Sequence, residues 1–313
     1  MKKIINLLAE IDDNGLRVDQ FINKYEQSLS RSKIKNLIIK KNLSINDKLS
    51  DDPSKKIKIN DVYSVHQKKY VDDFINGLLN ESQQRKIGLR PWTPQIVERT
   101  LYIMGGSVSA LKSAIENGAS GNLAGGTHHA YYDFGSGYCI FNDLAICASY
   151  CQRNFTNLKN ILIIDLDVHQ GDGTAALLKD EDLVYTFSMH CESNFPLKKQ
   201  QSNLDISLKR DLGDQAYLRK LASTLEKLEN KRTDIVFFQA GVDSLTFDSL
   251  GHLNLSHTGI RKRNELVFNF CKTQNTPVVV FMGGGYSNPI DHTVNAISEL
   301  FYQCRDFTEQ LQT

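Results

Sequence analysis

Short apolar runs alternate with stretches of helical spacing over most of this sequence. Five runs have the length and composition of buried strands: residues 121–124, 161–165, 183–188, 235–240 and 278–282. Because these runs lack polar alternation and are separated by helical stretches, they predict a parallel sheet covered by helices on both faces. Ligands of such sheets bind beyond the carboxyl ends of the strands, so this edge is where a functional site is expected.

The first 65 residues follow a different pattern. Apolar residues recur at helical spacing over residues 17–25 and 32–40, and residues 43–48 resemble a strand that enters a turn. Ser30 suits the N-cap of the second helix. We therefore predict a small α+β module over residues 1–65, followed by the larger α/β domain.

Composition is that of an ordinary globular protein, with 41% hydrophobic and 23% charged residues among 313. An N-terminal apolar run is cut short by Glu10, too early for a signal peptide, and no segment has membrane-spanning length. The cysteines lack CxxC spacing, which predicts free thiols in a reducing compartment and a cytoplasmic location without membrane partners. They are Cys139, Cys147, Cys151, Cys191, Cys271 and Cys304.

Charge divides the chain in the same way as the hydrophobic pattern. Residues 1–65 hold 13 Lys and Arg against 9 Asp and Glu, whereas the whole chain has a net charge of +1. The second predicted helix carries a run of basic residues with no acidic residue between them, which suits contacts to phosphates. For a bare charge run, a solvated helix face is the favoured alternative.

The N-terminal part of the chain resembles the S-four-type RNA-binding module at the front of many bacterial pseudouridine synthases. The resemblance is carried by residues 17–21, 30–33, 45–48, Pro53 and residues 60–62. The catalytic signature of those synthases does not follow, so synthase activity is not expected. The resemblance implies structured RNA as a partner of the module. The RNA-binding residues would be Arg17, Ser30, Arg31, Lys33 and Lys35.

The apolar run at 161–165 ends in an acidic and then glycine-rich segment. Asp165, Asp167 and His169 alternate there, so an extended backbone would place their side chains on one side. Buried together, such groups require a cationic partner, and a metal ion supplies one. Asp243 follows the run at 235–240 and a glycine, and it provides a third ligand from another strand end. Two carboxylates and one imidazole favour zinc, although oxygen-rich ligation also admits ferrous iron.

Two further strand ends carry groups suited to amide hydrolysis. His128 and His129 follow a Gly-Gly turn, and Asp165 and Asp172 are carboxylates able to orient them. Tyr286 follows three glycines and would donate to a developing oxyanion. Each feature alone has a structural alternative: a structural histidine pair, an Asp that caps a helix, or a flexible glycine loop.

Together, the order HH, DxDxHxxDG, GxD and GGGY resembles the histone deacetylase superfamily, here its bacterial class-IV-like branch. Residues 141–143 and 188–190 add to this resemblance, which runs from about residue 66 to residue 300. It implies a three-layer parallel-sheet fold of the arginase/deacetylase type. The family's usual first strand and helix have no counterpart, and the rim aspartate that some members use to hold the substrate backbone has no clear match near residues 88–91.

The resemblance also implies roles for individual residues. The zinc ligands would be Asp167, His169 and Asp243, and Tyr286 would polarise the scissile carbonyl. His129 with Asp172 would act as general base and acid, and His128 with Asp165 as its electrostatic partner. An acyl-lysine channel would be lined by Gly137, Tyr138, Phe195 and Leu250, the last two having core packing as an alternative. A monovalent cation would be held by Asp165, Asp167, His169, Ser188 and Met189.

The sequence therefore predicts a zinc-dependent deacetylase over residues 66–313 that hydrolyses an acyl amide. Acetylated lysine, a polyamine or another small acylated amine would be the substrate. The alternative function is an RNA-binding protein with an incomplete or inactive deacetylase-like body.

Overall fold

The computed structural model describes residues 18–27, 29, 33–34, 37, 44–45, 48–49 and 59–312. The chain divides into two compact units, Met1–Lys56 and Ile57–Thr313, and each is described by itself. In the first unit, α1 spans Val18–Tyr25 and β1 (Ser44–Ile45) pairs antiparallel with β2 (Lys48–Leu49). The predicted helix over residues 17–25 corresponds to α1, and the predicted strand near residues 43–48 corresponds to β1. The predicted turn falls on residues 46–47, outside the described residues.

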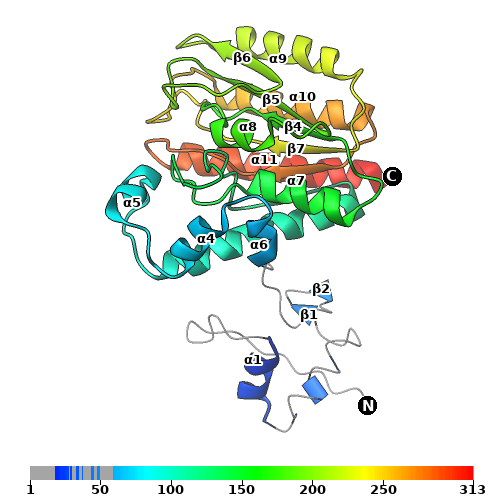
Figure 1. Ribbon diagram of the computed structural model, residues 1–313. Coiled ribbons are helices and arrows are strands. Elements are labelled where there is room, and N and C mark those ends of the chain that lie inside the picture. The colour runs from blue at the N-terminus through cyan, green and yellow to red at the C-terminus, as the bar shows by residue number, and fades with distance from the viewer. Residues whose placement is uncertain are drawn as a thin grey trace. The chain divides into compact units, whose positions relative to one another are not determined.

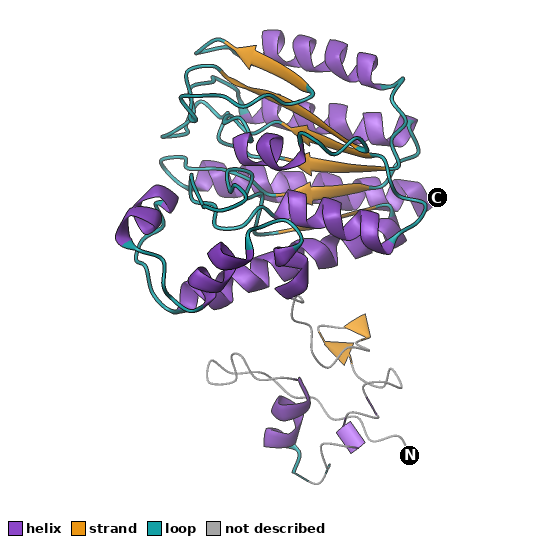
Figure 2. Ribbon diagram, viewed as in Figure 1, coloured by secondary structure: helices purple, strands orange, loops and turns teal. Residues whose placement is uncertain are grey.

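A single six-stranded sheet forms the centre of the second unit, and all neighbouring strands are parallel. The strand order across the sheet is β3, β8, β7, β4, β5, β6. Figure 2 shows these strands as one layer between helices. The strands are β3 (Ala119–Asn122), β4 (Ile161–Asp165), β5 (Val184–Cys191), β6 (Leu204–Leu208), β7 (Ile235–Gln239) and β8 (Val278–Phe281).

The register of the central strands brings their carboxyl ends to one level. Asp165, the last residue of β4, lies opposite Gln239 of β7 and Ser188 of β5. Gln239 in turn lies opposite Phe281, the last residue of β8. The loops after β4, β7 and β8 therefore leave the sheet side by side, which places the acidic and glycine residues that follow these strands along one edge.

One face of the sheet is covered by α6 (Gln95–Asn117), α7 (Asp143–Asn154) and the short α8 (Asp172–Leu178). Figure 1 shows α7 and α8 in front of the sheet and α6 along its lower side. Alternate strand residues such as Ile163 and Phe237 point into this layer. Around it pack α3 (Ile59–Tyr63), α4 (Lys68–Ile75) and α5 (Glu81–Ile87).

The opposite face is covered by α9 (Asp214–Leu228), α10 (His257–Thr273) and α11 (Asp291–Gln312). It receives the intervening strand residues, among them Ile164 and Phe238. Local signals fix the start of α10, because Ser256 at its N-cap accepts a hydrogen bond from the N–H of Gly259. Burial of strand residues on both faces explains why the apolar runs show no alternation, and the predicted parallel fold is confirmed.

The segment before residue 66 belongs in part to this second unit. Val62 of α3 is fully buried, and the carboxylate of Asp61 is 3.0 Å from the guanidinium of Arg153 on α7. The structural division after Lys56 thus falls earlier than the boundary expected between residues 65 and 66.

Two strands differ from the prediction. The first strand of the sheet is Ala119–Asn122 and not residues 121–124, because the chain turns away at Leu123, which is 69% exposed. The edge strand β6 was not predicted at all. Its residues Leu204–Leu208 are mostly half-buried and mix apolar with polar side chains, so they lack the continuous apolar run of the central strands.

All six cysteines are buried free thiols, as predicted. Among the described residues, no helix combines the length and apolar character needed to cross a membrane.

Candidate metal centre and active site

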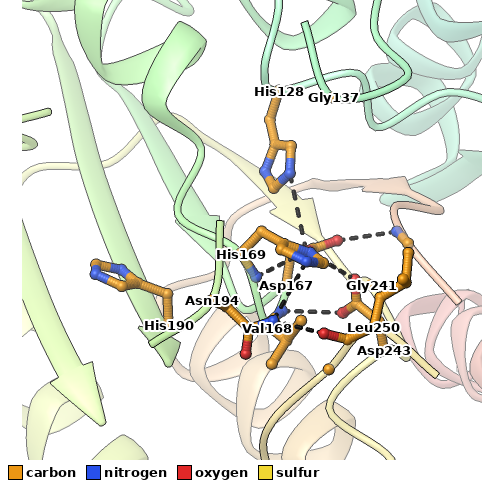
Figure 3. Close-up of polar contacts among 12 residues, drawn as sticks. His128, Gly137, Asp167, Val168, His169, His190, Asn194, Gly241, Asp243 and Leu250 are labelled. Carbon is orange, nitrogen blue, oxygen red and sulfur yellow. Dashed lines mark hydrogen bonds and ion pairs between the residues drawn. The ribbon is translucent and has the colours of Figure 1, made fainter. Parts of the chain in front are cut away.

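Three side chains with metal-ligand chemistry converge at the carboxyl edge of the sheet. Asp167, His169 and Asp243 each offer one ligand atom within 4.8 Å of the others. Nδ1 of His169 is 3.1 Å from Oδ1 of Asp167 and 3.1 Å from Oδ2 of Asp243. Figure 3 shows the imidazole beside both carboxylates. All three residues are buried, so the structure brings the predicted ligand set together away from bulk water.

A turn, and not a strand, carries the first two ligands. β4 ends at Asp165 and the backbone bends over residues 167–169. The N–H of Asp167 donates to Oδ1 of Asp165 at 3.1 Å, and the N–H of His169 donates to Oδ1 of Asp167 at 3.0 Å. Aspartates commonly form such bonds to the backbone two residues onward. The expected extended conformation is therefore wrong, but the turn still brings Asp167 and His169 together.

Glycines allow the loops after β7 and β8 to pack directly on the ligands. A Cβ on Gly241 would lie 2.1 Å from Oδ2 of Asp167, and a Cβ on Gly284 would lie 2.1 Å from Oδ2 of Asp243. The N–H of Gly284 donates to Oδ2 of Asp167 at 2.9 Å, and the N–H of Val168 donates to Oδ1 of Asp243 at 2.9 Å. Each carboxylate is thus held by the backbone of a neighbouring loop.

The charges of the cluster fit a divalent cation. Burial and the neighbouring Asp167 raise the pKa of Asp243 to about 7. Burial also opposes ionisation of Asp167, but His128 and His169 outweigh it and hold the pKa of that carboxyl well below its usual range. In the metal-free chain the two carboxylates raise the pKa of His169 to about 11 against the effect of burial, so its imidazolium balances part of their charge. A divalent cation that displaced this proton would match the two negative charges. The donor set fits zinc, and its oxygen atoms also accept ferrous iron.

Two histidine–aspartate pairs lie next to this cluster. Nδ1 of His128 is 2.8 Å from Oδ2 of Asp165, and Nδ1 of His129 is 2.6 Å from Oδ1 of Asp172. The two imidazole centroids are 4.1 Å apart. The hydroxyl of Tyr131 donates to the second oxygen of Asp172 at 2.9 Å. Both imidazoles are therefore oriented through Nδ1. Nε2 of His128 lies 3.8 Å from Oδ1 of Asp167, whereas Nε2 of His129 is left for other chemistry.

The two imidazoles have opposite protonation preferences. Burial alone would lower the pKa of His128, but the charges of Asp165 and Asp167 outweigh it and raise that pKa to about 9. Burial, together with the charge of His128, lowers the pKa of His129 to about 4. At neutral pH the arrangement thus favours a cationic His128 beside a neutral His129, which is the form that accepts a proton.

The turn that presents these histidines is anchored by Asp143, at the start of α7. Its carboxylate accepts the N–H groups of Gly126 and Thr127 at 2.9 and 2.7 Å, and the Ser107 hydroxyl at 2.8 Å. Asp143 belongs to a segment that carries the family resemblance, but its anchoring role was not predicted because the three partners are distant in sequence.

Tyr286 lies in the loop after β8. Burial, with the charges of Asp243 and Asp167, raises the pKa of its hydroxyl, which therefore stays protonated and able to donate. Its ring centroid is 5.8 Å from that of Tyr138. The predicted polarising tyrosine is thus placed close to the metal cluster.

The four residues predicted to line a channel lie around the same site. A Cβ on Gly137 would lie 2.6 Å from Cδ2 of His129. The ring centroids of Phe195 and His129 are 4.9 Å apart, with an interplanar angle of 83°. Tyr138, Phe195 and Leu250 are 44%, 41% and 39% exposed. Because none of these three side chains is buried, the alternative of core packing for Phe195 and Leu250 is excluded.

Of the residues expected to hold a monovalent cation, Asp165 and Ser188 are neighbours in the sheet. Ser188 lies opposite Asp165 in the sheet, and its hydroxyl is 2.9 Å from Nδ1 of His190. Met189 follows within β5 and is fully buried. The loop with Asp167 and His169 begins directly after Asp165.

Of the predicted RNA-binding residues, only Lys33 is among the described ones, where it is exposed in a helical segment. Arg17, Ser30, Arg31 and Lys35 lie outside the described residues. RNA binding by this module stays a prediction.

Two polar residues near the site gave no signal in the sequence. Asn194 is buried, donates from Nδ2 to the carbonyl of Leu250 at 2.7 Å and accepts the N–H of His252 at 2.9 Å. Arg263 is fully buried beneath the ligand loops. It was overlooked because it occurs in an Arg-Lys-Arg run that is typical of a solvated helix face.

Comparisons with known proteins show the family of this chain. The family model of the histone deacetylase domain matches residues 26–301. An uncharacterised protein of Picosynechococcus sp. is 46% identical over 243 residues, covering 77% of this chain and 80% of that protein. Histone deacetylase 2 of Arabidopsis thaliana is 34% identical over 187 residues, covering 58% and 48%. Acetoin utilization protein AcuC of Staphylococcus aureus is 28% identical over 247 residues, covering 71% and 63%.

A solved structure, that of a histone deacetylase homologue from Aquifex aeolicus, superposes with a TM-score of 0.70 at 23% identity. The superposition covers 88% of this chain and 77% of that one, which confirms the deacetylase-type fold. The chain belongs to the histone deacetylase family. It spans about half of the Arabidopsis protein and less than two thirds of AcuC, 48% and 63% of their lengths. The family match begins inside the segment that resembles the S-four-type module.

Proposed function

We propose that this protein is a zinc-dependent deacetylase that hydrolyses the acyl amide of lysine or of a related amine. The observation that carries the proposal is the convergence of Asp167, His169 and Asp243 beside two oriented histidines. A metal-ligand triad, a neutral imidazole and a protonated phenol at one sheet edge are the groups that amide hydrolysis requires.

The metal would be held by His169 through Nδ1 and by one carboxylate oxygen each from Asp167 and Asp243. When bound, zinc supplies Lewis acidity to the attacking water and to the scissile carbonyl. Proton transfer and stabilisation of the oxyanion are carried out by side chains of the protein.

His129 acts as the general base and then as the general acid. Its Nδ1 is directed at Asp172, so Nε2 is the atom that takes a proton from the attacking water. The same atom returns the proton to the departing amine. The low pKa of His129 keeps Nε2 unprotonated before the reaction, and Asp172 stabilises the imidazolium that forms during it.

His128 and Tyr286 stabilise charge. His128, kept cationic by Asp165 and Asp167, lies 4.1 Å from His129, centroid to centroid, and favours negative charge at the reacting carbonyl. The Tyr286 hydroxyl donates a hydrogen bond to the oxyanion as it develops. A monovalent cation bound by Asp165, Asp167, His169, Ser188 and Met189 would add to the support beneath the ligands.

The half-exposed rings of Tyr138 and Phe195 and the side chain of Leu250 suit an extended, mostly apolar substrate arm that ends in an amide. Acetylated lysine in a protein has this form, and so does an acetylated polyamine or another small acylated amine. The buried thiols fit a reducing compartment, and we place the enzyme in the cytoplasm.

The test is release of acetate from an acetyl-lysine peptide and from an acetylated polyamine by zinc-loaded full-length protein. Asp243→Ala is expected to remove zinc and activity together, whereas Arg153→Gln on α7 should leave both unchanged. Turnover by Asp243→Ala at the wild-type rate would refute the proposal.

A further inference from the structure

Arg263 of α10 is among the largest side chains that are fully buried in the described residues. Its neighbour in the sequence run, Arg261, behaves as the pattern predicts: its side chain is 60% exposed and its Nε is 3.1 Å from a carboxylate oxygen of Glu265. Burying a guanidinium costs free energy unless its donors are satisfied. The burial of Arg263, on the same helix as the exposed Arg261, therefore requires an explanation.

The guanidinium of Arg263 donates to backbone carbonyls on two different loops. One terminal nitrogen donates to Leu166 at 3.3 Å and to Gly241 at 2.5 Å, and the other donates to Ala240 at 3.0 Å. Nε and one terminal nitrogen also donate to Oδ1 of Asn264 at 3.1 and 2.9 Å. The side chain thus satisfies most of its five donors inside the protein.

These carbonyl groups belong to residues that lie one to three positions before a metal ligand in the chain. Leu166 precedes Asp167, and Ala240 and Gly241 precede Asp243 by three and two residues. The strand ladder between the two loops ends where the N–H of Leu166 donates to the carbonyl of Gln239 at 3.0 Å. Beyond that bond, the guanidinium bridges the two loops.

The surroundings also offset the charge of Arg263. Burial lowers its pKa, whereas Tyr217, followed by Asp243 and Asp167, raises it. Its cation lies 5.7 Å from the ring centroid of Phe238. The charge is therefore compensated by carbonyl dipoles, by Tyr217 and by the ligand carboxylates, with no carboxylate in direct contact among the described residues.

We propose that Arg263 is a positioning residue that clamps the loops at residues 166–169 and 240–243, so that Asp167, His169 and Asp243 are preorganised for the metal. This inference rests on the proposed function, because it assigns Arg263 to the zinc site. One terminal nitrogen reaches both loops and the other holds Ala240, so the planar guanidinium fixes three carbonyl groups in one geometry. A lysine ammonium is a single nitrogen on a flexible stem and does not reproduce this geometry.

The test is the zinc affinity of folded, full-length variants, measured by competition with a chromophoric chelator. Arg263→Lys and Arg263→Met are both expected to bind zinc at least about tenfold more weakly than wild type, the size of effect seen when residues that orient metal ligands are lost. Arg261→Met, on the same helix but exposed, should keep wild-type affinity.

A second control separates positioning from general stability. Leu225 of α9 is buried in the same core but belongs to neither ligand loop nor α10, so Leu225→Ala lowers stability without removing the clamp. We expect Leu225→Ala to keep its zinc affinity. Arg263→Lys should lose zinc affinity even though its unfolding temperature is equal to or higher than that of Leu225→Ala. Amide hydrogen exchange should also rise at residues 166–169 and 240–243 in Arg263→Lys.

Wild-type zinc affinity in Arg263→Lys would overturn the inference and leave the proposed function intact. If Arg263→Met does not fold, the lysine variant and the exchange measurement still decide. Failure of the wild-type chain itself to bind zinc would overturn the proposed function, and this inference with it.

Discussion

The backbone N–H of Tyr286 donates to Oδ2 of Asp248 at 2.6 Å. The other oxygen of Asp248 accepts the N–H groups of Leu250 and Gly251 at 2.9 and 2.8 Å, and the carbonyl of Tyr286 accepts the N–H of Ser249 at 3.1 Å. One carboxylate therefore fixes both the proposed oxyanion donor and the loop that carries a channel residue. The position of Tyr286 depends on a residue that takes no part in the chemistry.

Asp248→Asn tests this dependence. An amide nitrogen cannot accept a hydrogen bond, so the variant loses the bond to Tyr286 or those to Leu250 and Gly251. We expect kcat to fall about tenfold, corresponding to roughly 1.4 kcal/mol, with zinc content unchanged. Asp180→Asn, at an exposed carboxylate, is the matched control and should keep the wild-type kcat. A wild-type kcat in Asp248→Asn would show that Tyr286 is positioned by other contacts.

Tyr286→Phe removes only the proposed oxyanion donor. Loss of one oxyanion donor in a serine protease lowers kcat by about 10²–10³, and the same range is expected here. Zinc affinity should change little, because no atom of Tyr286 belongs to the ligand set. Tyr302→Phe serves as control, since Tyr302 is 57% exposed on α11 and has no assigned role in the site. Equal kcat values for the two variants would remove Tyr286 from the mechanism.

Gly241→Ala and Gly284→Ala test the close packing of backbone on the ligands. Each added Cβ would lie 2.1 Å from a ligand carboxylate oxygen, so the carboxylate must move. We expect zinc affinity to drop by about tenfold or more. At Gly213 the nearest atom to an added Cβ is 3.6 Å away, and Gly213→Ala should bind zinc normally. Tight zinc binding by both site variants would mean that the ligands do not need these glycines.

His66 predicts a pH dependence of stability away from the metal site. It is 1% exposed, its Nδ1 is 2.8 Å from the carbonyl oxygen of Tyr131, and its Nε2 accepts the N–H of Asn142 at 2.9 Å. Burial lowers its pKa to about 4 from an ordinary value of 6.5. The unfolded chain therefore binds more protons between these values, so stability is full above pH 6.5 and is lost as pH falls towards 4.

The expected loss from His66 is about 3 kcal/mol between pH 7 and pH 4. Urea unfolding of wild type and of His66→Gln at several pH values measures it, because glutamine can both donate and accept but does not titrate. The variant should be less stable at pH 7 and lose less stability on acidification. Parallel pH curves for the two proteins would contradict the assignment of a buried neutral imidazole.

The central sheet could be predicted from sequence because its strands are buried on both faces and so appear as unbroken apolar runs, such as residues 235–240. The edge strand β6 could not, since one side of it is only half-buried and its composition resembles a loop. The active-site residues could be predicted for a related reason. Side chains with catalytic or metal-binding chemistry follow successive buried strands, and the carboxyl ends of these strands meet at one edge.

Residues that support the site through contacts to groups distant in sequence could not be predicted in this way. Arg263 has the sequence context of an exposed helix, and only tertiary packing shows its carbonyl partners on two loops. Asp248 and Asp143 are ordinary loop and helix-start aspartates until the backbone groups that they bind are known. The turn at residues 167–169 likewise depends on bonds that alternation alone does not specify.

The most direct test of the account is a zinc titration of chelator-treated, full-length protein, with acetate release from an acetyl-lysine peptide measured at each point. The account predicts that activity is absent without metal, rises in proportion to bound zinc and saturates at about one zinc per chain. Acetate release that does not depend on zinc, or no release from a folded chain with its zinc bound, for every acylated amine tried, would contradict it.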